Sequence, residues 1–431
     1  MTESLLGFAA ALALCLLRVP IAIALGLVGF VGFGLLIDWE ASLAQAAQVI
    51  SDTALDYGLS VVPLFILMGN LVTRAKLSDE LYAASHAFLG HRRGGLAYAT
   101  ILACGGFSAV CGSSVATAAT MTNVAMPSMR RYRYRDELAV GSIAAGGTLG
   151  ILIPPSIVLV IYGLLTQTSI GRLFAAGILP GLVAIMFYCL AIFFTTRVVR
   201  DAGPPTERQS WAVRLKALRA VWGVLVLFTV VMGGIYIGVF TPTEAAGIGA
   251  VVAFFFALLR RELNLSRVLD VLADSAYTTA SLFFVLIGAL LFANFVNTAG
   301  MTQQLGEFVS NLRLSPYAVL WVILLIYIVL GCVFESISMV LLTVPIFFPL
   351  VQTLGFDLIW FGIVVVCVTE LSLITPPVGL NIFVVRGMLP EVPTLVIMRG
   401  LTPFIAADLL RLIVIVHIPW LSLVLPRLLF G

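Results

Sequence analysis

The chain has 431 residues, of which 61% are hydrophobic and only 10% are charged, and its mean hydropathy is +1.12. Because a soluble domain carries about 25% charged residues, this composition excludes a soluble globular protein and predicts that most of the surface faces a lipid bilayer. The net charge of +3 requires no nucleic-acid partner, since the basic residues cluster between the apolar stretches, where a membrane protein places them.

The amino terminus and the reactive residues give no sign of processing or of catalysis. Residues 1–4 are not basic, and no small-residue cleavage site follows before the next apolar stretch, so we expect a retained helix. The six cysteines lie in apolar runs without metal-ligand spacing, which favours buried free thiols. The three histidines form no HExxH or other catalytic pair, and we therefore expect no catalytic residues and no enzyme.

Apolar stretches near the length of about 20 residues that a membrane helix needs recur along the chain. They lie at residues 3–17, 20–37, 59–73, 138–166, 170–197, 220–240, 242–259, 275–297, 358–385 and 401–425. Arginine, proline and a polar segment at 198–219 separate them. We predict an all-α polytopic membrane protein with about ten transmembrane helices, of which the first and third are short.

The basic residues assign the sides of the membrane and single out one stretch that cannot cross it once. By the positive-inside rule, the dense basic segments at 91–93, 130–135 and 197–219 face the cytoplasm. Residues 94–129 are apolar, yet both of their ends then lie on the cytoplasmic side. We predict a re-entrant helical hairpin that turns at 111–114, with two short crossings as the alternative. Such a turn must be buried in protein or line a watery cavity, so its tip is a candidate site.

The two halves of the sequence align at a nearly constant offset. The matches, at shifts of 222 to 224, are Pro20 with Pro242, Asn70 with Asn294, Ser114 with Ser336, Pro127 with Pro349, Pro154-Pro155 with Pro376-Pro377, Gly177 with Gly400, and Pro180 with Pro403. We predict a first repeat over 1–197, a cytoplasmic connecting segment over 198–219 and a second repeat over 220–431. Because each repeat would hold five crossings, the second copy is inverted, and its hairpin at 317–350 opens to the periplasm.

Each repeat also contains a pair of adjacent prolines inside an apolar stretch. The pairs are Pro154-Pro155, within a predicted broken helix at 138–166, and Pro376-Pro377, within one at 358–385. A proline removes a backbone donor and clashes with the preceding turn, so the carbonyls before each pair need other partners. Na⁺ and neighbouring hydroxyls would supply them. The competing interpretations are simple packed kinks, and hydroxyls such as that of Thr117 that bond to their own preceding turn.

The half-helices after the proline pairs are candidate anion sites. Their amino termini, at Ser156 and around Gly379, carry partial positive charge and free N–H groups that would attract a substrate carboxylate. Gly112 and Gly150, like Gly379, allow the backbone to approach a ligand closely.

Four charged residues inside the apolar stretches are candidates for function or for internal pairing. We predict that Glu335, at the second hairpin tip, takes part in the ion or substrate site, because an intramembrane carboxylate is costly; a structural hydrogen bond is the alternative. Glu370 lies six residues before Pro376 and would relay a proton or an ion, or pair with an arginine of the bundle. Asp408 and Arg411 are three residues apart and are expected to neutralise one another.

These motifs, in this order, resemble the large membrane subunit of the tripartite ATP-independent periplasmic (TRAP) transporters, the DctM type. The resembling segments are PLFILMGNLV (63–72), GFSAVCGSSVATAATM (106–121), GTLGILIPPSIVLVIYG (147–163), GRLFAAGILPGL (171–182), GVFTPTEAAGIGA (238–250) and ITPPVGLNIFV (374–384). The resemblance implies an elevator mechanism of the ion-transporter superfamily, with both hairpins and both broken helices in a transport domain. It also implies Na⁺-driven import of a small organic acid across the bacterial inner membrane, with no organic cofactor. The implied partners are a small membrane subunit and a periplasmic substrate-binding protein.

Carried over residue by residue, the resemblance predicts that these candidates, with further residues, form two cation sites and one substrate-binding region. The first cation site comprises Gly112, Ser113, Ser114, Thr117, Gly150 and Pro154, and the second comprises Glu335, Ser336, Ser338, Thr375 and Pro376. The substrate-binding region comprises Ser156, Thr375, Gly379 and Asn381. Cys111 departs from the pattern, which has a small hydroxylated residue or glycine beside the first tip.

Other functions are compatible with parts of the sequence. A stand-alone Na⁺-coupled dicarboxylate or citrate symporter with the same inverted hairpins would need no binding protein. An intramembrane hydrolase is disfavoured because His417, the only histidine in a predicted span, has no evident acid partner. A channel is disfavoured because paired broken helices argue against a continuous pore.

Overall fold

The computed structural model describes residues 2–311, 314–332 and 334–431, and every regular element in these ranges is helical. The first half contains α1 (Thr2–Leu16), α2 (Ile21–Leu36), α3 (Trp39–Leu55), the turn η1 (Gly58–Ser60), α4 (Val61–Arg74), α5 (Leu77–Leu89), α6 (Gly95–Cys111), α7 (Ser114–Arg131), α8 (Asp136–Thr148), the turn η2 (Leu149–Ile151), α9 (Ile157–Thr166) and α10 (Ile170–Val198). The all-α prediction is confirmed for the described part of the chain.

The second half continues with the same kinds of element. It contains α11 (Trp211–Ala220), α12 (Trp222–Phe228), the π-helical turn η3 (Thr229–Gly233), α13 (Gly234–Tyr236), α14 (Pro242–Leu259), α15 (Leu265–Thr298), α16 (Met301–Asn311), α17 (Pro316–Gly331), α18 (Ser336–Thr353), α19 (Leu358–Ile374), α20 (Leu380–Met388), α21 (Thr394–His417) and α22 (Trp420–Phe430). Helix α11 thus begins inside the predicted connecting segment 198–219.

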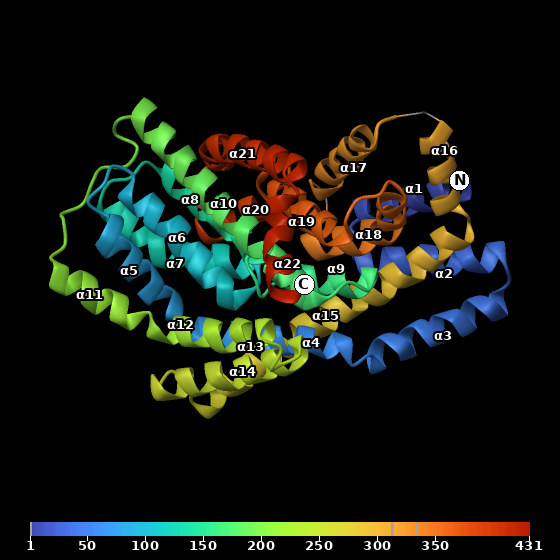
Figure 1. Ribbon diagram of the computed structural model, residues 1–431, viewed down its shortest axis with the longest axis horizontal. Helices are drawn as coiled ribbons and strands as arrows, with labels where there is room; N and C mark the ends of the chain where they lie inside the picture. The colour runs from blue at the N-terminus through green and yellow to red at the C-terminus, as the bar shows by residue number, and fades with distance from the viewer. Residues whose placement is uncertain (1, 312–313, 333) are drawn as a thin grey trace.

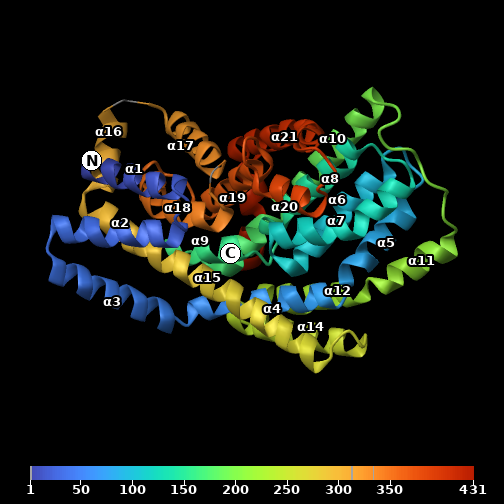
Figure 2. The same cartoon turned by 180° about the vertical axis from the view of Figure 1, so that it is seen from behind.

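Helices of the two halves are interleaved rather than separate. Helices α3, α4, α12 and α14 lie along one long edge of the molecule, and α17 and α21 lie along the opposite edge (Figures 1 and 2). Helix α15 packs along α2 and α4, and α21 packs on α8. The hydrophobic core therefore contains residues from both halves of the chain.

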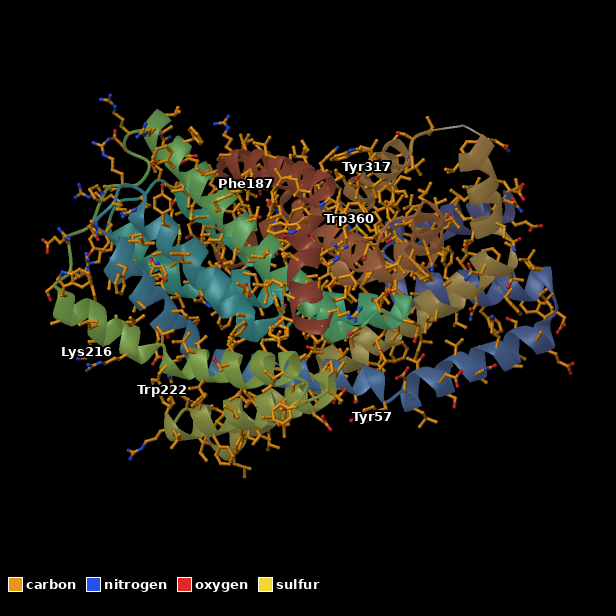
Figure 3. The ribbon with its side chains drawn as sticks, in the orientation of Figure 1. Tyr57, Phe187, Lys216, Trp222, Tyr317 and Trp360 are labelled. Atoms are coloured by element: carbon orange, nitrogen blue, oxygen red, sulfur yellow. The ribbon has the colours of Figure 1, made fainter. Side chains whose placement is uncertain are left out.

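The two broken helices occupy the centre of this arrangement. Every residue from Leu138 to Thr148 in α8 and from Trp360 to Ile374 in α19 is buried. The indole of Trp360 lies inside the helices and donates a hydrogen bond to the Ile415 carbonyl at 3.0 Å, whereas Trp222 and Tyr57 project from the periphery (Figure 3). Protein rather than lipid therefore surrounds the helical arms that precede both proline pairs.

Corresponding helices of the two halves begin at offsets close to that of the sequence repeat. The starts are Gly95 and Pro316 for α6 and α17, Ser114 and Ser336 for α7 and α18, Asp136 and Leu358 for α8 and α19, Ile157 and Leu380 for α9 and α20, and Ile170 and Thr394 for α10 and α21. These starts differ by 221 to 224 residues. The order of the elements is the one that a duplication requires, while the repeat boundaries and the opposite orientation of the copies in a membrane stay predictions.

Each predicted hairpin is a pair of antiparallel-packed helices joined by a short turn. Helix α6 ends at Gly112, which has a φ of +68° that a residue with a side chain rarely adopts, and Ser113 caps α7 by accepting a hydrogen bond from the Ala116 amide. The second pair, α17 and α18, is separated by four residues, of which Val333 lies outside the described residues. The sequence thus predicted the position of both turns; whether the pairs re-enter or cross the membrane stays a prediction.

Several helices differ from the predicted stretches. Helix α3 was missed because polar residues interrupt its apolar ones, although Asp38 caps it by accepting the Ala41 amide hydrogen at 2.7 Å. Helices α5 and α16 were missed for the same reason. The stretch 401–425 is not one helix, since α21 ends at His417 and Pro419 precedes α22. Pro419 lacks the backbone N–H that would continue the hydrogen bonds of α21, and its fixed φ suits the start of α22.

The described residues include six helices long and apolar enough to cross a membrane. They are α10, the α11–α13 unit (Trp211–Tyr236), α14, α15, α18 and α21. The bent pair of α3 with η1 and α4, which turns by 56°, brings the number to seven if it is one span. The chain is therefore a multi-pass membrane protein by the length and composition of its helices, and the predicted count of ten crossings stays untested.

The first hairpin can be tested by labelling from the two sides of the membrane. Cysteines placed at Arg92 and Arg131 flank α6 and α7, and a re-entrant hairpin predicts that a membrane-impermeant maleimide reaches both from the cytoplasmic side only. A cysteine at Val239, in the exposed turn before α14, is the control and should react from the opposite side. Labelling of positions 92 and 131 from opposite sides would show that this segment crosses the membrane.

Candidate functional site

The first break separates α8 from α9 and is stabilised by its own hydroxyl. Helix α8 ends at Thr148, η2 follows, and Ser156 caps α9 by accepting the Leu159 amide hydrogen at 3.3 Å. The Ser156 hydroxyl also donates to the Ile151 carbonyl, and the residue is fully buried. Both hydrogen-bonding roles of this hydroxyl are thus used inside the break, and its predicted contact with substrate stays a prediction.

The second break separates α19 from α20 and is more open. The Thr375 hydroxyl donates to the Leu371 carbonyl at 2.6 Å, and Gly379, with a φ of +53°, precedes α20. Pro376 and Pro377 are exposed, whereas Pro154 and Pro155 are buried. The peptide bond between the two prolines is cis in both breaks. The two breaks are therefore alike in their backbone and unlike in their exposure.

One buried asparagine joins the two broken helices. The Asn381 amide, near the start of α20, donates to the Ala144 carbonyl of α8 at 3.0 Å. Its Oδ1 atom is buried and accepts no hydrogen bond within the described residues. A Cβ atom at Gly147 of α8 would lie 3.1 Å from the same amide nitrogen. Asn381 therefore ties the second broken helix to the first, and it lies away from the cavity described below.

Each hairpin tip contacts the break of its own half. A Cβ atom at Gly150 would lie 2.5 Å from the Ser113 carbonyl oxygen, and one at Gly112 would lie 2.8 Å from the Pro155 carbonyl oxygen. In the second half, the Cys332 thiol donates to the Pro376 carbonyl at 3.8 Å. The glycines predicted for close approach of a ligand thus let two segments of backbone approach one another.

The hydroxyls of Thr117 and Ser338, near the two tips, form hydrogen bonds with residues three or four positions earlier in the chain. The Thr117 hydroxyl donates to the Ser113 carbonyl at 2.7 Å, so for this residue the structure supports the local interpretation. The Ser338 hydroxyl donates to Glu335 Oε2 at 3.3 Å. Cys111 is buried, and its carbonyl oxygen would lie 2.8 Å from a Cβ atom at Gly69 of α4. Cys111, the residue that departs from the family pattern, also lines the cavity described below.

A cavity of about 360 Å³ joins the two hairpin tips. Five of the predicted site residues line it: Gly112, Ser113, Ser114, Glu335 and Ser336. The other predicted residues lie outside its lining: Thr117, Gly150, Pro154, Ser156, Ser338, Thr375, Pro376, Gly379 and Asn381. The amino-terminal turns of α7 and α18 both contribute to the wall, which brings two positive helix ends to one space.

Two polar residues of this wall were not predicted. Asn70 of α4 lines the cavity and donates to the Ser275 hydroxyl at 2.8 Å, and Thr278 of α15 also lines it. Asn70 could have been found, because it matches Asn294 in the sequence repeat, whereas Thr278 stands in no motif. Among the described residues, Glu335 is the only charged one in the lining. From these residues the cavity offers hydroxyl, amide and carboxylate oxygens but no cationic side chain.

A second cleft of about 500 Å³ adjoins the cavity at Asn70, which lines both. Its charged lining residues are Arg74, Lys76, Glu262, Arg267 and Asp274. Lys76 and Arg267 form ion pairs with Glu262 at 2.7 and 3.2 Å, and the hydrogen bond from Lys76 lowers the pKa of Glu262. Three basic and two acidic residues thus line a cleft that shares Asn70 with the cavity.

The predicted intramembrane charges form one buried cluster away from this cavity. Arg411 lies 2.6 Å from Glu370 and 3.1 Å from Asp408, and none of the three side chains is exposed. The expected pairing of Asp408 with Arg411 is confirmed. For Glu370, the structure supports the pairing with an arginine of the bundle.

Comparisons with known proteins agree over nearly the whole chain. Residues 8–421 match the family described as the DctM component of the tripartite ATP-independent periplasmic transporter. The chain is 39% identical over 388 residues to the C4-dicarboxylate TRAP transporter large permease protein DctM of Pseudomonas aeruginosa, with 90% of each chain covered. It is 30% identical over 388 residues to the sialic acid TRAP transporter large permease protein SiaM of Vibrio cholerae, again with 90% of each covered.

A solved structure supports the fold alone. The YdaH transporter of Alcanivorax borkumensis superposes with a TM-score of 0.66 at 14% sequence identity, covering 97% of this chain and 98% of that one.

The contact between the first tip and its break predicts a cost for Gly150→Ala. The added Cβ would meet three backbone atoms of Ser113 and Ser114 at 2.5 to 2.9 Å, and backbone cannot rotate away. Overpacking of this kind costs about 1–3 kcal/mol, so we expect a lower melting temperature in detergent or nanodiscs. Gly387→Ala, where nothing lies within 4 Å of the added atom, is the matched control. Equal melting temperatures for the two variants would contradict the packing of tip against break.

Proposed function

Because this chain belongs to the DctM component family of the tripartite ATP-independent periplasmic transporters, we propose that it couples the entry of Na⁺ to the import of a small organic acid. Its relatives are large permease subunits and not enzymes, so the chain is the large permease of such a transporter. The proposal adds the driving ion, the class of substrate and the mechanism.

The observation that carries the proposal is the cavity between the two hairpin tips. Of the described residues that line it, only Glu335 is charged, so an organic anion that enters the cavity adds its negative charge to that of a carboxylate. Bound Na⁺ would offset this charge, and hydroxyl and carbonyl oxygens are the ligands that hard cations prefer. The positive ends of α7 and α18 would supply N–H groups to the carboxylate of the substrate.

The substrate that we propose is a C4-dicarboxylate. The relative from Pseudomonas aeruginosa is named for that substrate and is 39% identical, whereas the relative named for sialic acid is 30% identical. A volume of about 360 Å³ lies at the small end of the range of about 300–1,000 Å³ for ligand sites, which favours a small acid.

An elevator movement would carry the cavity across the membrane. The moving unit would comprise the hairpins α6–α7 and α17–α18 with the broken helices α8–α9 and α19–α20, and the scaffold would comprise the outer helices, among them α2, α4, α14 and α15. Support comes from the contact of each tip with its own break, which is tight in the first half, and from the outer helices, which pack mainly on one another. The unequal exposure of the two proline pairs is expected of a protein with one side of the site open.

The proposed partners are a small membrane subunit and a periplasmic substrate-binding protein, in the bacterial inner membrane. They follow from the family and not from a surface of this chain. The alternative, a stand-alone Na⁺/dicarboxylate symporter of the same architecture, differs in needing neither partner.

Reconstitution separates these functions. We expect proteoliposomes that hold this chain, its small subunit and its binding protein to accumulate labelled C4-dicarboxylate under an imposed inward Na⁺ gradient. Liposomes that lack the binding protein should show no uptake above that of empty liposomes. Uptake by the chain alone would support the stand-alone symporter, and uptake that ignores the Na⁺ gradient would contradict Na⁺ coupling.

Two variants test the cavity as the coupling site. Ser114→Ala removes a hydroxyl from the cavity wall, and Glu335→Gln removes its carboxylate, so each should raise the Na⁺ concentration for half-maximal uptake. A lost ligand worth about 1 kcal/mol corresponds to about a fivefold increase. Ser281→Ala, whose exposed hydroxyl donates to the Tyr277 carbonyl on α15, is the control and should leave this concentration unchanged. Wild-type Na⁺ dependence in both cavity variants would remove these residues from the ion site.

A further inference from the structure

The buried charges outside the cavity form a continuous chain of contacts between the two broken helices. Glu370 of α19 contacts Arg411 of α21, and Arg411 contacts Asp408 one turn earlier, at 2.6 and 3.1 Å. The Tyr188 hydroxyl of α10 donates to Asp408 Oδ2 at 2.7 Å and lies 2.9 Å from the hydroxyl of Thr148. We name Glu370, Arg411 and Asp408 the charge cluster.

The charge cluster holds one positive group and two carboxyl groups. Arg411 is the only basic side chain that interacts with Glu370 within the described residues, and Asp408 is the only other charged group that does so. Two further titratable groups lie near the cluster, the Cys367 thiol of α19 itself and the Tyr188 phenol of α10. With both carboxyl groups ionised, the cluster would carry a net charge of −1.

The other charged groups on helices packed against α19 do not interact with Glu370 within the described residues; they are Asp136 and Glu137 of α8, Arg172 and Arg197 of α10, Arg399 and His417 of α21, and Arg427 of α22. Helices α9 and α17 bring the tyrosines Tyr162 and Tyr327, and Tyr162 donates to the Leu358 carbonyl at the far end of α19. Arg386, the arginine of α20, donates instead to the Val392 carbonyl. An excess charge in the protein interior, cut off from water, costs several kcal/mol, and the more so inside a membrane.

One oxygen of the cluster also lacks a partner. Glu370 Oε1 is buried and accepts no hydrogen bond from the described residues. Asp408, by contrast, accepts the hydroxyl hydrogen of Tyr188 on Oδ2. A proton on Glu370 would remove the excess charge, and a neutral carboxyl oxygen costs less to bury without a partner than an ionised one.

We propose that the charge cluster is a proton-binding site, in which one proton resides on Glu370 while Asp408 and Arg411 form a neutral pair. The proton comes from water and bonds to a carboxylate oxygen of Glu370, and no other bond breaks. Glu370 lies four residues before Ile374, which ends α19, and the chain of contacts reaches Thr148, which ends α8. The bound proton therefore lies between α8 and α19, the helices that precede the two breaks. Its loss would leave a buried excess charge, which would destabilise the packing of these helices.

The test uses the purified chain in lipid nanodiscs and does not depend on transport. Infrared spectroscopy at neutral pH detects the C=O stretch of a protonated carboxylic acid apart from the bands of carboxylates and amides, and we expect this band in the wild type. Glu370→Gln should lose it, because the amide replaces the protonated group. Asp408→Asn should lose it as well, because Glu370 then faces Arg411 alone and ionises.

Asp274→Asn, at an exposed carboxylate of α15, is the matched control and should keep the band. Elution at the position of the wild type in gel filtration identifies the variants that fold, and either of the two cluster variants alone carries the test. A wild-type spectrum without the band, or a band that persists in every folded cluster variant, would overturn the proposal.

Discussion

The structure depends on one constraint, which is that backbone groups freed inside a membrane must find partners within the protein. Two proline pairs free such groups in mid-helix, and lipid offers them nothing. The chain answers the constraint by burying α8 and α19 at the centre and by laying a hairpin tip against each break. Gly112 and Gly150 are required at the first contact because a side chain at either position would collide with backbone.

This constraint also explains where the candidate site lies. Because each hairpin tip contacts a break, both tips lie near the middle of the molecule. There the amino-terminal ends of α7 and α18 line one cavity. Since the described part of its wall holds a carboxylate and no cationic side chain, we propose that helix ends and bound ions supply the positive charge. The buried charge cluster contacts both helices that end at the breaks, α19 through Glu370 and α8 through Tyr188 and Thr148. We therefore propose that the protonation state of the cluster affects how these two helices pack.

The sequence predicted those parts of the fold that proline, glycine and hydropathy encode. The turns at Gly112 and before Ser336, the two breaks and the matching order of the halves lie where the pattern placed them. Helix α3 was not predicted because its polar residues interrupt the apolar stretch. The end of α21 was not predicted because hydropathy stays high across Pro419, where the helix breaks. In the site, Ser114 and Glu335 line the cavity, but Thr117 and Asn381 bond elsewhere, since spacing alone does not show which way a side chain faces.

The central claim is that the space between the two tips binds the ion and the acid together. Its most direct test is a cryo-electron microscopy map of the transporter with its small subunit, in Na⁺ and a C4-dicarboxylate, compared with a map in K⁺ without the acid. The account predicts density for the acid between the turn at Ser113-Ser114 and Glu335, present only in the first map. Density for the acid elsewhere, with this cavity empty in both maps, would contradict it.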